Sequence, residues 1–207
     1  MILQKYDYIN IPQKTNDVVK DVANLLRCNG REDTLLHAED VARVNGELAD
    51  RFGLSREKCI IAALLHDISV IVTPEDMMRY AIENHFEICE AERRFPFLLH
   101  QRFSRLIASE FFEITDTDIL SAIECHTSLK ASPSPSDMAL FIADKLAWDQ
   151  EGIPPYYDVV DSALDKSLEK ACYVFMTFVM EHKMLLYPHT NWTLAYDFLK
   201  EKCAADA

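Results

Sequence analysis

Residues 59–67, CIIAALLHD, form a strongly apolar segment that ends in an adjacent histidine and aspartate. Ser55 precedes the segment, and serine is favoured where helices begin, so we expect a buried helix here. An aspartate is rare at the buried end of such a helix unless its charge is compensated. A divalent metal ion compensates it directly, with His66 as a neutral nitrogen ligand and Asp67 as an anionic oxygen ligand that can bridge two ions. One such pair is weak evidence, but it predicts a metal site.

Four further polar side chains interrupt apolar helical patterns elsewhere in the chain: His37, His100, His126 and Asp144. His37 lies on the apolar stripe of the preceding helix, and Asp144 directly follows the apolar run MALFIA. A single histidine in such a place is more often a hydrogen-bonded core residue. Several buried ionisable groups on separate helices are hard to explain as independent core residues. We therefore interpret them jointly as one metal site.

The apolar spacing predicts an all-α, single-domain fold, with no strand pair and no internal repeat. Asp33 and Thr34 are both suited to cap the second helix, the segment 86–96 is unassigned, and residues 132–136 are expected to form a polar loop. The stretch after Pro154-Pro155 is too short for a second core, so residues 151–207 are expected to pack as C-terminal helices within one domain, 1–207. About nine helices are expected, over residues 15–29, 33–53, 55–67, 74–84, 97–112, 116–126, 137–149, 159–186 and 192–202.

The net charge of −13, from 34 acidic residues against 21 Lys plus Arg, disfavours nucleic acid and anionic membrane as partners. A phosphate-bearing substrate would need its charge met locally, by metal ions or a few cations. Six cysteines are spread singly, without a C-x-x-C pair, and neither a signal peptide nor a spanning segment is evident. We therefore expect a cytoplasmic protein with reduced cysteines.

Five short motifs, taken in order, resemble those of a known family: LHAEDV at 36–41, AALLHD at 62–67, LLH at 98–100, AIECHT at 122–127 and IADK at 142–145. The resemblance, over about residues 24–150, is to the HD-domain superfamily of metal-dependent phosphohydrolases. Within it the chain is most similar to the YqeK-type branch, which splits diadenosine tetraphosphate symmetrically into two ADP.

The resemblance implies a set of roles for the six residues. His37, His66, Asp67 and Asp144 would bind a first metal ion, with Asp67 bridging, and the pair of histidines at 100 and 126 would bind a second. Iron is the expected metal, although manganese, zinc or nickel would also suit these ligands. His66 and Asp67 form the catalytic pair, and a hydroxide held by the ions would attack phosphorus.

The chain departs from the family pattern at several positions. The run 68–71, with Val70, lacks the usual lysine after the His-Asp pair, and Gln101 and Leu129 stand where glycines are usual. Ala147 and Gln150 replace an acidic residue and an arginine. These changes would reshape the nucleotide pocket and leave the metal ligands unchanged.

Cations that could replace the missing ones are Lys145, Arg102 and Lys130, with Arg105 nearby, although each could equally be a solvated surface charge. The leading hypothesis is a hydrolase that acts on a small-molecule nucleotide. Two alternatives stay open: a phosphatase for other nucleotides, and a nucleotide-binding or sensing module with little turnover, which the missing cations favour.

Several other residues are not assigned to the site. His85, His182 and His189 are expected to have surface or structural roles. Trp148 and Trp192 could stack on a base, but packing roles are favoured. The apolar stretch at 174–184 is expected to be core or the face of a homodimer.

Overall fold

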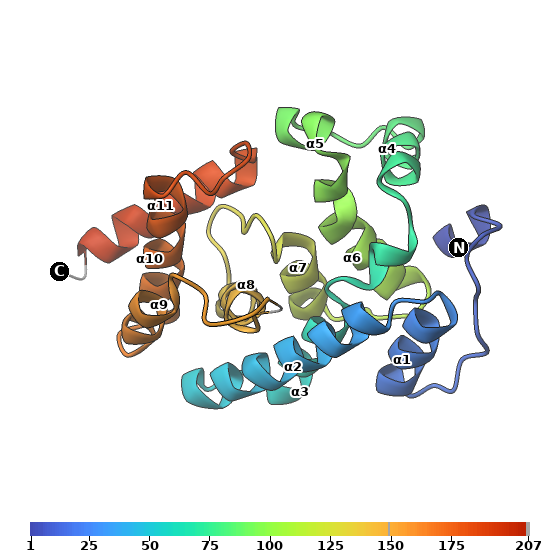
Figure 1. Cartoon of the computed structure of the whole chain (residues 1–207), viewed down its shortest axis with the longest axis horizontal. Helices are drawn as coiled ribbons and strands as arrows, with labels where there is room; N and C mark the ends of the chain where they lie inside the picture. Colours follow the sequence, from blue (N-terminus) through green and yellow to red (C-terminus); the bar gives the residue numbers. More distant parts are fainter. Residues whose placement is uncertain (149, 206–207) are drawn as a thin grey trace.

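The fold is built around a long helix, α2 (Glu32–Phe52), which packs against α3 (Arg56–Leu65) and α8 (Pro135–Leu146) (Figure 1). Buried residues of α2 recur at helical spacing, among them Leu35, Val41 and Leu48. The helix ends at Gly53, whose φ of 68° lies in the left-handed region that glycine adopts without strain. Helix α2 therefore presents one continuous apolar face to two neighbours.

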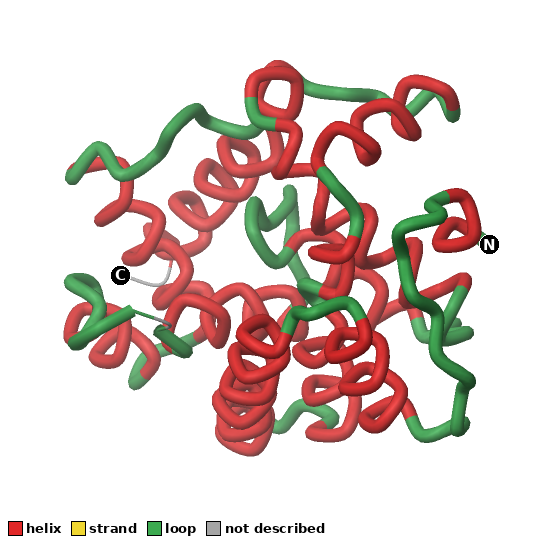
Figure 2. Tube along the Cα trace, turned by 45° about the vertical axis from the view of Figure 1, so that its right-hand side comes forward, coloured by secondary structure: helices red, strands yellow, loops and turns green. Residues whose placement is uncertain are grey.

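The computed structural model describes residues 1–148 and 150–205, and within these ranges it contains helices and loops and no strand (Figure 2). The predicted all-α fold is confirmed. No described helix is long and apolar enough to cross a membrane. The remaining elements are η1 (Ile2–Lys5), α1 (Val18–Cys28), η2 (Ile68–Ile71), α4 (Pro74–Glu83), α5 (Glu90–Arg94), η3 (Pro96–Leu99), α6 (His100–Glu110), α7 (Thr117–Cys125), α9 (Tyr157–Leu164), α10 (Leu168–Glu181) and α11 (Thr190–Ala205).

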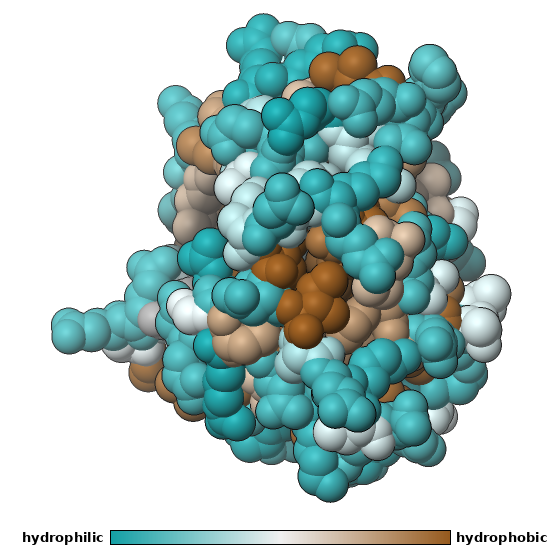
Figure 3. Space-filling model, turned by 90° about the vertical axis from the view of Figure 1, so that its right-hand side faces the viewer, coloured by the Kyte–Doolittle hydropathy of each residue, from teal (hydrophilic) through white to brown (hydrophobic). Residues whose placement is uncertain are grey.

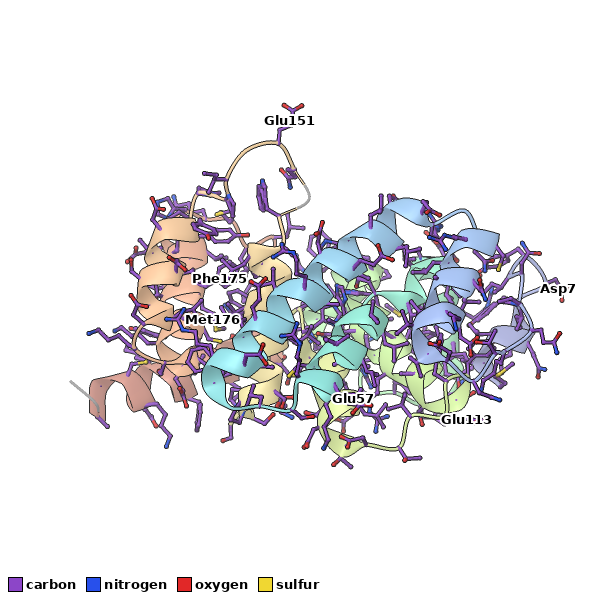
Figure 4. The ribbon with its side chains drawn as sticks, turned by 90° about the horizontal axis from the view of Figure 1, so that it is seen from below. Asp7, Glu57, Glu113, Glu151, Phe175 and Met176 are labelled. Carbon is purple, nitrogen blue, oxygen red and sulfur yellow. The ribbon has the colours of Figure 1, made fainter. Side chains whose placement is uncertain are left out.

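Helices α9, α10 and α11 lie together at the end of the molecule opposite the N-terminus (Figure 1). They pack on α8 through aromatic side chains: the ring of Phe141 on α8 is 5.5 Å from Phe175 on α10 and 6.0 Å from Trp192 on α11. Phe175 and Met176 lie on the part of α10 that faces α8 (Figure 4). The first part of the apolar stretch at 174–184 is therefore core of this chain, whereas residues 180–184 are exposed.

The surface is mostly polar, in keeping with the high charge of the chain. The face shown in Figure 3 is largely hydrophilic, with a hydrophobic patch near its centre and smaller ones toward its edges. Glu151 extends outward from the connection between α8 and α9 (Figure 4). The apolar half of the composition is thus largely interior.

Several sequence-based boundaries are wrong. The expected helix 159–186 is two helices, α9 and α10, because the chain breaks at 165–167 and Ser167 starts the second helix by accepting a hydrogen bond from the Lys170 amide at 3.1 Å. Neither Asp33 nor Thr34 caps α2, which already begins at Glu32. The unassigned segment 86–96 contains α5, so the described residues form eleven α-helices, more than the nine expected.

The segment 132–136 is also not entirely a loop, since Ser134 begins α8 with a reciprocal cap. The Ser134 hydroxyl accepts from the Asp137 amide at 3.2 Å, and the Asp137 carboxylate accepts from the Ser134 amide at 2.8 Å. The buried Asp137 carboxylate also accepts from Ser121 on α7 at 2.5 Å and pairs with Lys130 at 2.9 Å. The start of α8 is thereby fixed against α7.

This cap predicts a measurable stability effect. Ser134→Ala should lower the free energy of unfolding by about 1 kcal/mol, because the first-turn amide of Asp137 loses its acceptor. Urea denaturation followed by circular dichroism measures the change. Ser136→Ala, within the same first turn, is the matched control and should change stability by less than about 0.5 kcal/mol. Equal effects of the two substitutions would contradict the role of the cap.

Candidate metal centre

Six side chains that lie far apart in the sequence converge at one point of the helix bundle. His37 comes from the second turn of α2, Asp144 from α8, and the others from helix ends: His66 and Asp67 after α3, His100 at the start of α6, and His126 after α7. The side chains of His66 and His126 are buried, whereas Asp67 retains 30% exposure. The cluster is therefore closed on one side and open to solvent beside Asp67.

The first half of the cluster surrounds Asp144. Its Oδ1 atom lies 3.1 Å from Nε2 of His37 and 3.6 Å from Nε2 of His66. Oδ2 of Asp67 lies 3.4 Å from the same His66 nitrogen. Two nitrogens and two carboxylate oxygens thus face a common point.

The second half lies on the other side of Asp67. Its Oδ1 atom is 3.5 Å from Nε2 of His100 and 3.3 Å from Nε2 of His126, and these two nitrogens are 3.0 Å apart. Asp67 presents one carboxylate oxygen to each half of the cluster. This is the arrangement that a carboxylate bridging two cations requires.

The donor atoms fit divalent ions. Metal–nitrogen and metal–oxygen bonds of about 2.0–2.2 Å place neighbouring ligand atoms about 3 Å apart or slightly more, which is the spacing seen here. Nε2 of His66 and Oδ1 of Asp67 are buried and have no hydrogen-bond partner. Such orphaned atoms are costly unless a cation or proton satisfies them.

Three of the histidines are held by the same local contact. Nδ1 of His66, His100 and His126 donates to the backbone carbonyl three residues earlier, at 2.6, 2.7 and 2.8 Å respectively. Each histidine directly follows a helical turn, where the last carbonyls lack the regular helical partner and are open to a side-chain donor. Because a carbonyl can only accept, Nδ1 carries a hydrogen, and in the neutral imidazole the lone pair is on Nε2, which faces the cluster.

The carboxylates and imidazoles strongly perturb one another. Burial alone would raise the pKa of Asp67, but His66, His126 and His100 hold the pKa of that carboxyl well below its usual range. Burial would likewise raise the pKa of Asp144, and Lys145 outweighs it, together with the two histidines near Asp144. Both carboxylates are therefore ionised and available as ligands.

The two halves of the cluster differ in how they hold protons. Burial opposes protonation of His66, yet the charges of Asp67 and Asp144 raise the pKa of His66 to about 9. At His100 burial prevails and lowers the pKa to about 4. Without a bound cation, a proton on His66 therefore compensates part of the negative charge of Asp67 and Asp144.

A second cluster of metal-ligating residue types, Cys89, Glu92 and His189, does not have this chemistry. Nδ1 of His189 accepts the Asn191 amide at 3.1 Å, which caps the start of α11. A neutral imidazole that accepts at Nδ1 carries its hydrogen on Nε2, and here that atom lies 3.7 Å from Oε1 of Glu92. Nε2 has no lone pair to offer a metal, so His189 has a structural role in this arrangement.

The candidate substrate-binding cations separate into two places. Lys145 pairs with Asp144 and so lies at the six-residue cluster. Arg102 donates to the Glu87 carbonyl at 2.7 Å and pairs with Glu92 at 3.4 Å, while Lys130 pairs with Asp137. Arg102, Arg105 and Lys130 line a separate groove of about 660 Å³, to which none of the six clustered residues contributes.

Two departures from the family pattern have structural consequences. Gln101 is buried, donates to the Ser128 hydroxyl at 3.0 Å and accepts from the amides of Thr127 and Ser128, so it fixes the turn that follows His126. Leu129 is buried with a φ of 57°, a left-handed conformation that glycine adopts without strain. Val70 in η2, the buried Ala147 and the exposed Gln150 add no charge near the cluster.

One residue of the site escaped prediction. The hydroxyl of Thr127 lies 3.0 Å from Nε2 of His100, so it can donate to the nitrogen that faces the second half of the cluster. Its position directly after His126 is the signal that could have identified it. Threonine next to a helix end is so common that this signal alone predicts nothing.

Comparison with known proteins agrees with the geometry. The sequence model of the HD domain family matches residues 34–149. A Bacillus subtilis (strain 168) protein named bis(5'-nucleosyl)-tetraphosphatase, symmetrical, is 25% identical over 170 residues, which cover 79% of this chain and 91% of that protein. A Lactococcus lactis subsp. cremoris protein, named only as an uncharacterized protein in the pepC 5' region, is 35% identical over 127 residues. That match covers 61% of this chain and 65% of that relative, just under two thirds of its length.

A solved structure extends the comparison to nearly the whole chain. It is from Clostridium acetobutylicum and is described as a predicted HD superfamily hydrolase involved in NAD metabolism. The two structures superpose with a TM-score of 0.77 at 26% identity, over 92% of this chain and 100% of that chain. The similarity therefore includes helices beyond the segment that carries the six residues.

The proton on His66 predicts the pH dependence of metal binding. Because the pKa of His66 is raised to about 9, a cation that binds Nε2 below that pH must displace one proton. Apparent affinity should therefore rise about tenfold per pH unit between pH 6 and pH 8. Calorimetry of the metal-free protein with Mn²⁺, in buffers of different ionisation enthalpy, measures both the affinity and the proton release.

His85→Asn is a suitable control, since asparagine tolerates the left-handed backbone at His85 and this residue lies outside the cluster. The control should keep the same slope. An affinity that does not change with pH would contradict the assignment of the displaced proton to His66.

Proposed function

Because this chain belongs to the HD domain family, we propose that it is a metal-dependent hydrolase of nucleotide phosphoanhydrides. The substrate class we place first is the dinucleoside polyphosphates, with diadenosine tetraphosphate split symmetrically into two ADP. The name of the Bacillus subtilis relative supports this choice. The observation that carries the proposal is Asp67, whose two carboxylate oxygens face two separate groups of imidazole nitrogens.

In this proposal the six residues hold two divalent ions. His37, His66, Asp144 and Asp67 would hold the first ion, and Asp67 with the two remaining histidines would hold the second. Bound ions would lower the pKa of coordinated water and neutralise charge on phosphoryl oxygens. Nitrogen and oxygen ligands suit iron, our first choice, as well as manganese, zinc or nickel.

The reaction balances with water alone. The oxygen of water bonds to one of the two central phosphorus atoms, and the bond from that phosphorus to the central bridging oxygen breaks. Each half leaves as ADP, and the protons of water pass to the products and the solvent. Asp67 lies at the open side of the cluster, where it can orient the attacking water, while buried His66 positions Asp67.

Lys145 is the cation that we assign to substrate phosphate. Its ammonium pairs with Asp144 and its side chain is 19% exposed, so it can turn toward a phosphate at the rim of the cluster. Arg102 and Lys130 are held by carboxylates in the separate groove. A phosphate at the metal centre would therefore meet one lysine and the bound ions.

A nucleotide-binding module with little turnover is the second candidate. The absence of a cation at Val70 and at Gln150 is the observation that favours it. Such a module would be stabilised by nucleotides without consuming them. A phosphatase acting on other nucleotides would instead release orthophosphate.

The first test combines metal analysis with a substrate panel. Protein purified without chelator should contain about two metal ions per chain, because the cluster offers two sets of ligands. It should convert diadenosine tetraphosphate to ADP alone, measured by ion-exchange chromatography, and a chelator should abolish turnover. Release of orthophosphate or of AMP plus ATP would contradict symmetrical cleavage.

A charge-removing substitution tests the bridging role. Asp67→Asn preserves size but removes the anionic ligand, so turnover should fall about 100-fold or more and metal content should drop. Asp40→Asn on α2 removes an exposed carboxylate one turn from His37 and should leave both unchanged. Full turnover in Asp67→Asn would exclude Asp67 as the bridging ligand.

A further inference from the structure

A small, mostly apolar pocket of about 160 Å³ lies beside the second half of the metal centre. It forms where η3 and the turn after α7 meet the segment between α10 and α11. Its walls are largely aromatic and aliphatic, and the lining residues that the argument uses are Phe97, Thr127, Leu186, Tyr187, His189 and Trp192.

The pocket and the metal centre share residues. Thr127 lines the pocket, and its hydroxyl lies 3.0 Å from Nε2 of His100. Phe97 also lines the pocket, and its backbone carbonyl accepts the hydrogen bond from Nδ1 of His100 at 2.7 Å. A molecule in the pocket therefore lies next to the ligands of the second ion, within reach of a phosphate bound there.

Apolar side chains at the pocket are left exposed to solvent. The exposed fraction is 44% for Phe97 and 72% for Leu186, so these two side chains offer apolar surface to a ligand at the same pocket. Phe97 is a flat ring with a neighbouring phenyl group, Phe95, at 6.1 Å. A flat heteroaromatic ring would cover these surfaces by stacking.

One polar atom of the lining residues has no partner. Nε1 of Trp192 is buried without a hydrogen-bond acceptor, and the whole residue is 7% exposed. The other lining donor, Nε2 of His189, instead faces Oε1 of Glu92 at 3.7 Å. The unsatisfied indole N–H of Trp192 favours a ligand with acceptor atoms on its edge, as a purine has in its ring nitrogens.

We propose that this pocket binds the purine base of the nucleotide whose phosphates lie at the metal centre. The inference rests on the proposed function and adds the residues that recognise the base. Residues 184–192, which supply much of the wall, lie outside the segment 34–149 that matches the family model. The larger groove fits a base less well, because its charged side chains Arg102, Arg105 and Lys130 are already paired with carboxylates.

The test compares a ligand that has a base with one that lacks it. The probes are the methylene analogue of ADP, which resists hydrolysis, and methylenediphosphonate, which has the same two phosphorus groups but no nucleoside. Trp148→Phe leaves Trp192 as the reporter, because the chain has two tryptophans. With Mn²⁺ present, the ADP analogue should change Trp192 fluorescence, whereas methylenediphosphonate should bind, as measured by calorimetry, without that change.

Phe97→Ala tests the stacking surface itself. It should raise the dissociation constant of the ADP analogue about tenfold, the usual size of a lost base–aromatic contact, and leave that of methylenediphosphonate unchanged. Leu194→Ala on α11 is the matched control, because Leu194 is 48% exposed and lies outside the pocket. Leu186→Ala provides a second variant at the pocket, with the same expected direction.

The outcomes separate this inference from the proposed substrate when diadenosine tetraphosphate turnover is measured on the same samples. If the protein turns over diadenosine tetraphosphate but Phe97→Ala does not weaken binding of the ADP analogue, the pocket assignment is overturned and the proposed substrate stands. If the protein does not turn over diadenosine tetraphosphate but Phe97→Ala weakens binding of the ADP analogue, the pocket assignment is supported and the proposed substrate is overturned. Equal weakening of both probes by Phe97→Ala would also overturn base recognition, since it would indicate damage to the metal centre.

Discussion

The carboxylate of Asp67 is a largely buried negative charge that no lysine or arginine among the described residues contacts, and the surrounding helices are arranged to meet that charge. Three histidines approach its two oxygens at 3.3–3.5 Å. Asp144 adds a second carboxylate nearby, so the cluster attracts either protons or cations. Because the ligands come from different helices, cation binding and the packing of those helices are thermodynamically linked.

Whether a histidine lies at the C-terminal or the N-terminal end of a helix determines which of its ring nitrogens carries the hydrogen. His66 and His126 follow helix C-terminal ends, where carbonyls of the last turn accept from Nδ1 and leave Nε2 available to a metal ion. His189 precedes a helix N-terminal end, where an unpaired amide donates to Nδ1 and keeps the hydrogen on Nε2. The same type of side chain can therefore serve as a metal ligand in one place and as a hydrogen-bond donor in the other.

The metal centre and the proposed base pocket meet at Phe97 and Thr127, but beyond these residues they draw on different parts of the chain. The six clustered residues lie between positions 37 and 144, within the matched family segment, whereas much of the pocket wall lies at 184–192. Recognition of the base could therefore diverge while the metal ligands stay unchanged. The departures at Gln101 and Leu129 affect the turn between these two parts, since Gln101 bonds to the amides of Thr127 and Ser128.

The sequence by itself determined the all-α fold and the six residues that converge, because apolar spacing and its polar interruptions are local features of each helix. It also located the starts of several helices, as at Ser55 and Pro74. The break at 165–167 was missed, since the apolar pattern continues across it while the backbone does not.

Only the tertiary structure decided which polar groups are available for binding. Arg102 and Lys130 read as free cations in the sequence, but each is held by a buried carboxylate, Glu92 or Asp137 respectively. Trp192 read as a packing residue, and its unpartnered Nε1 became evident only beside the pocket. Whether a side chain is already paired depends on which distant residues the fold brings against it, and no local pattern contains that information.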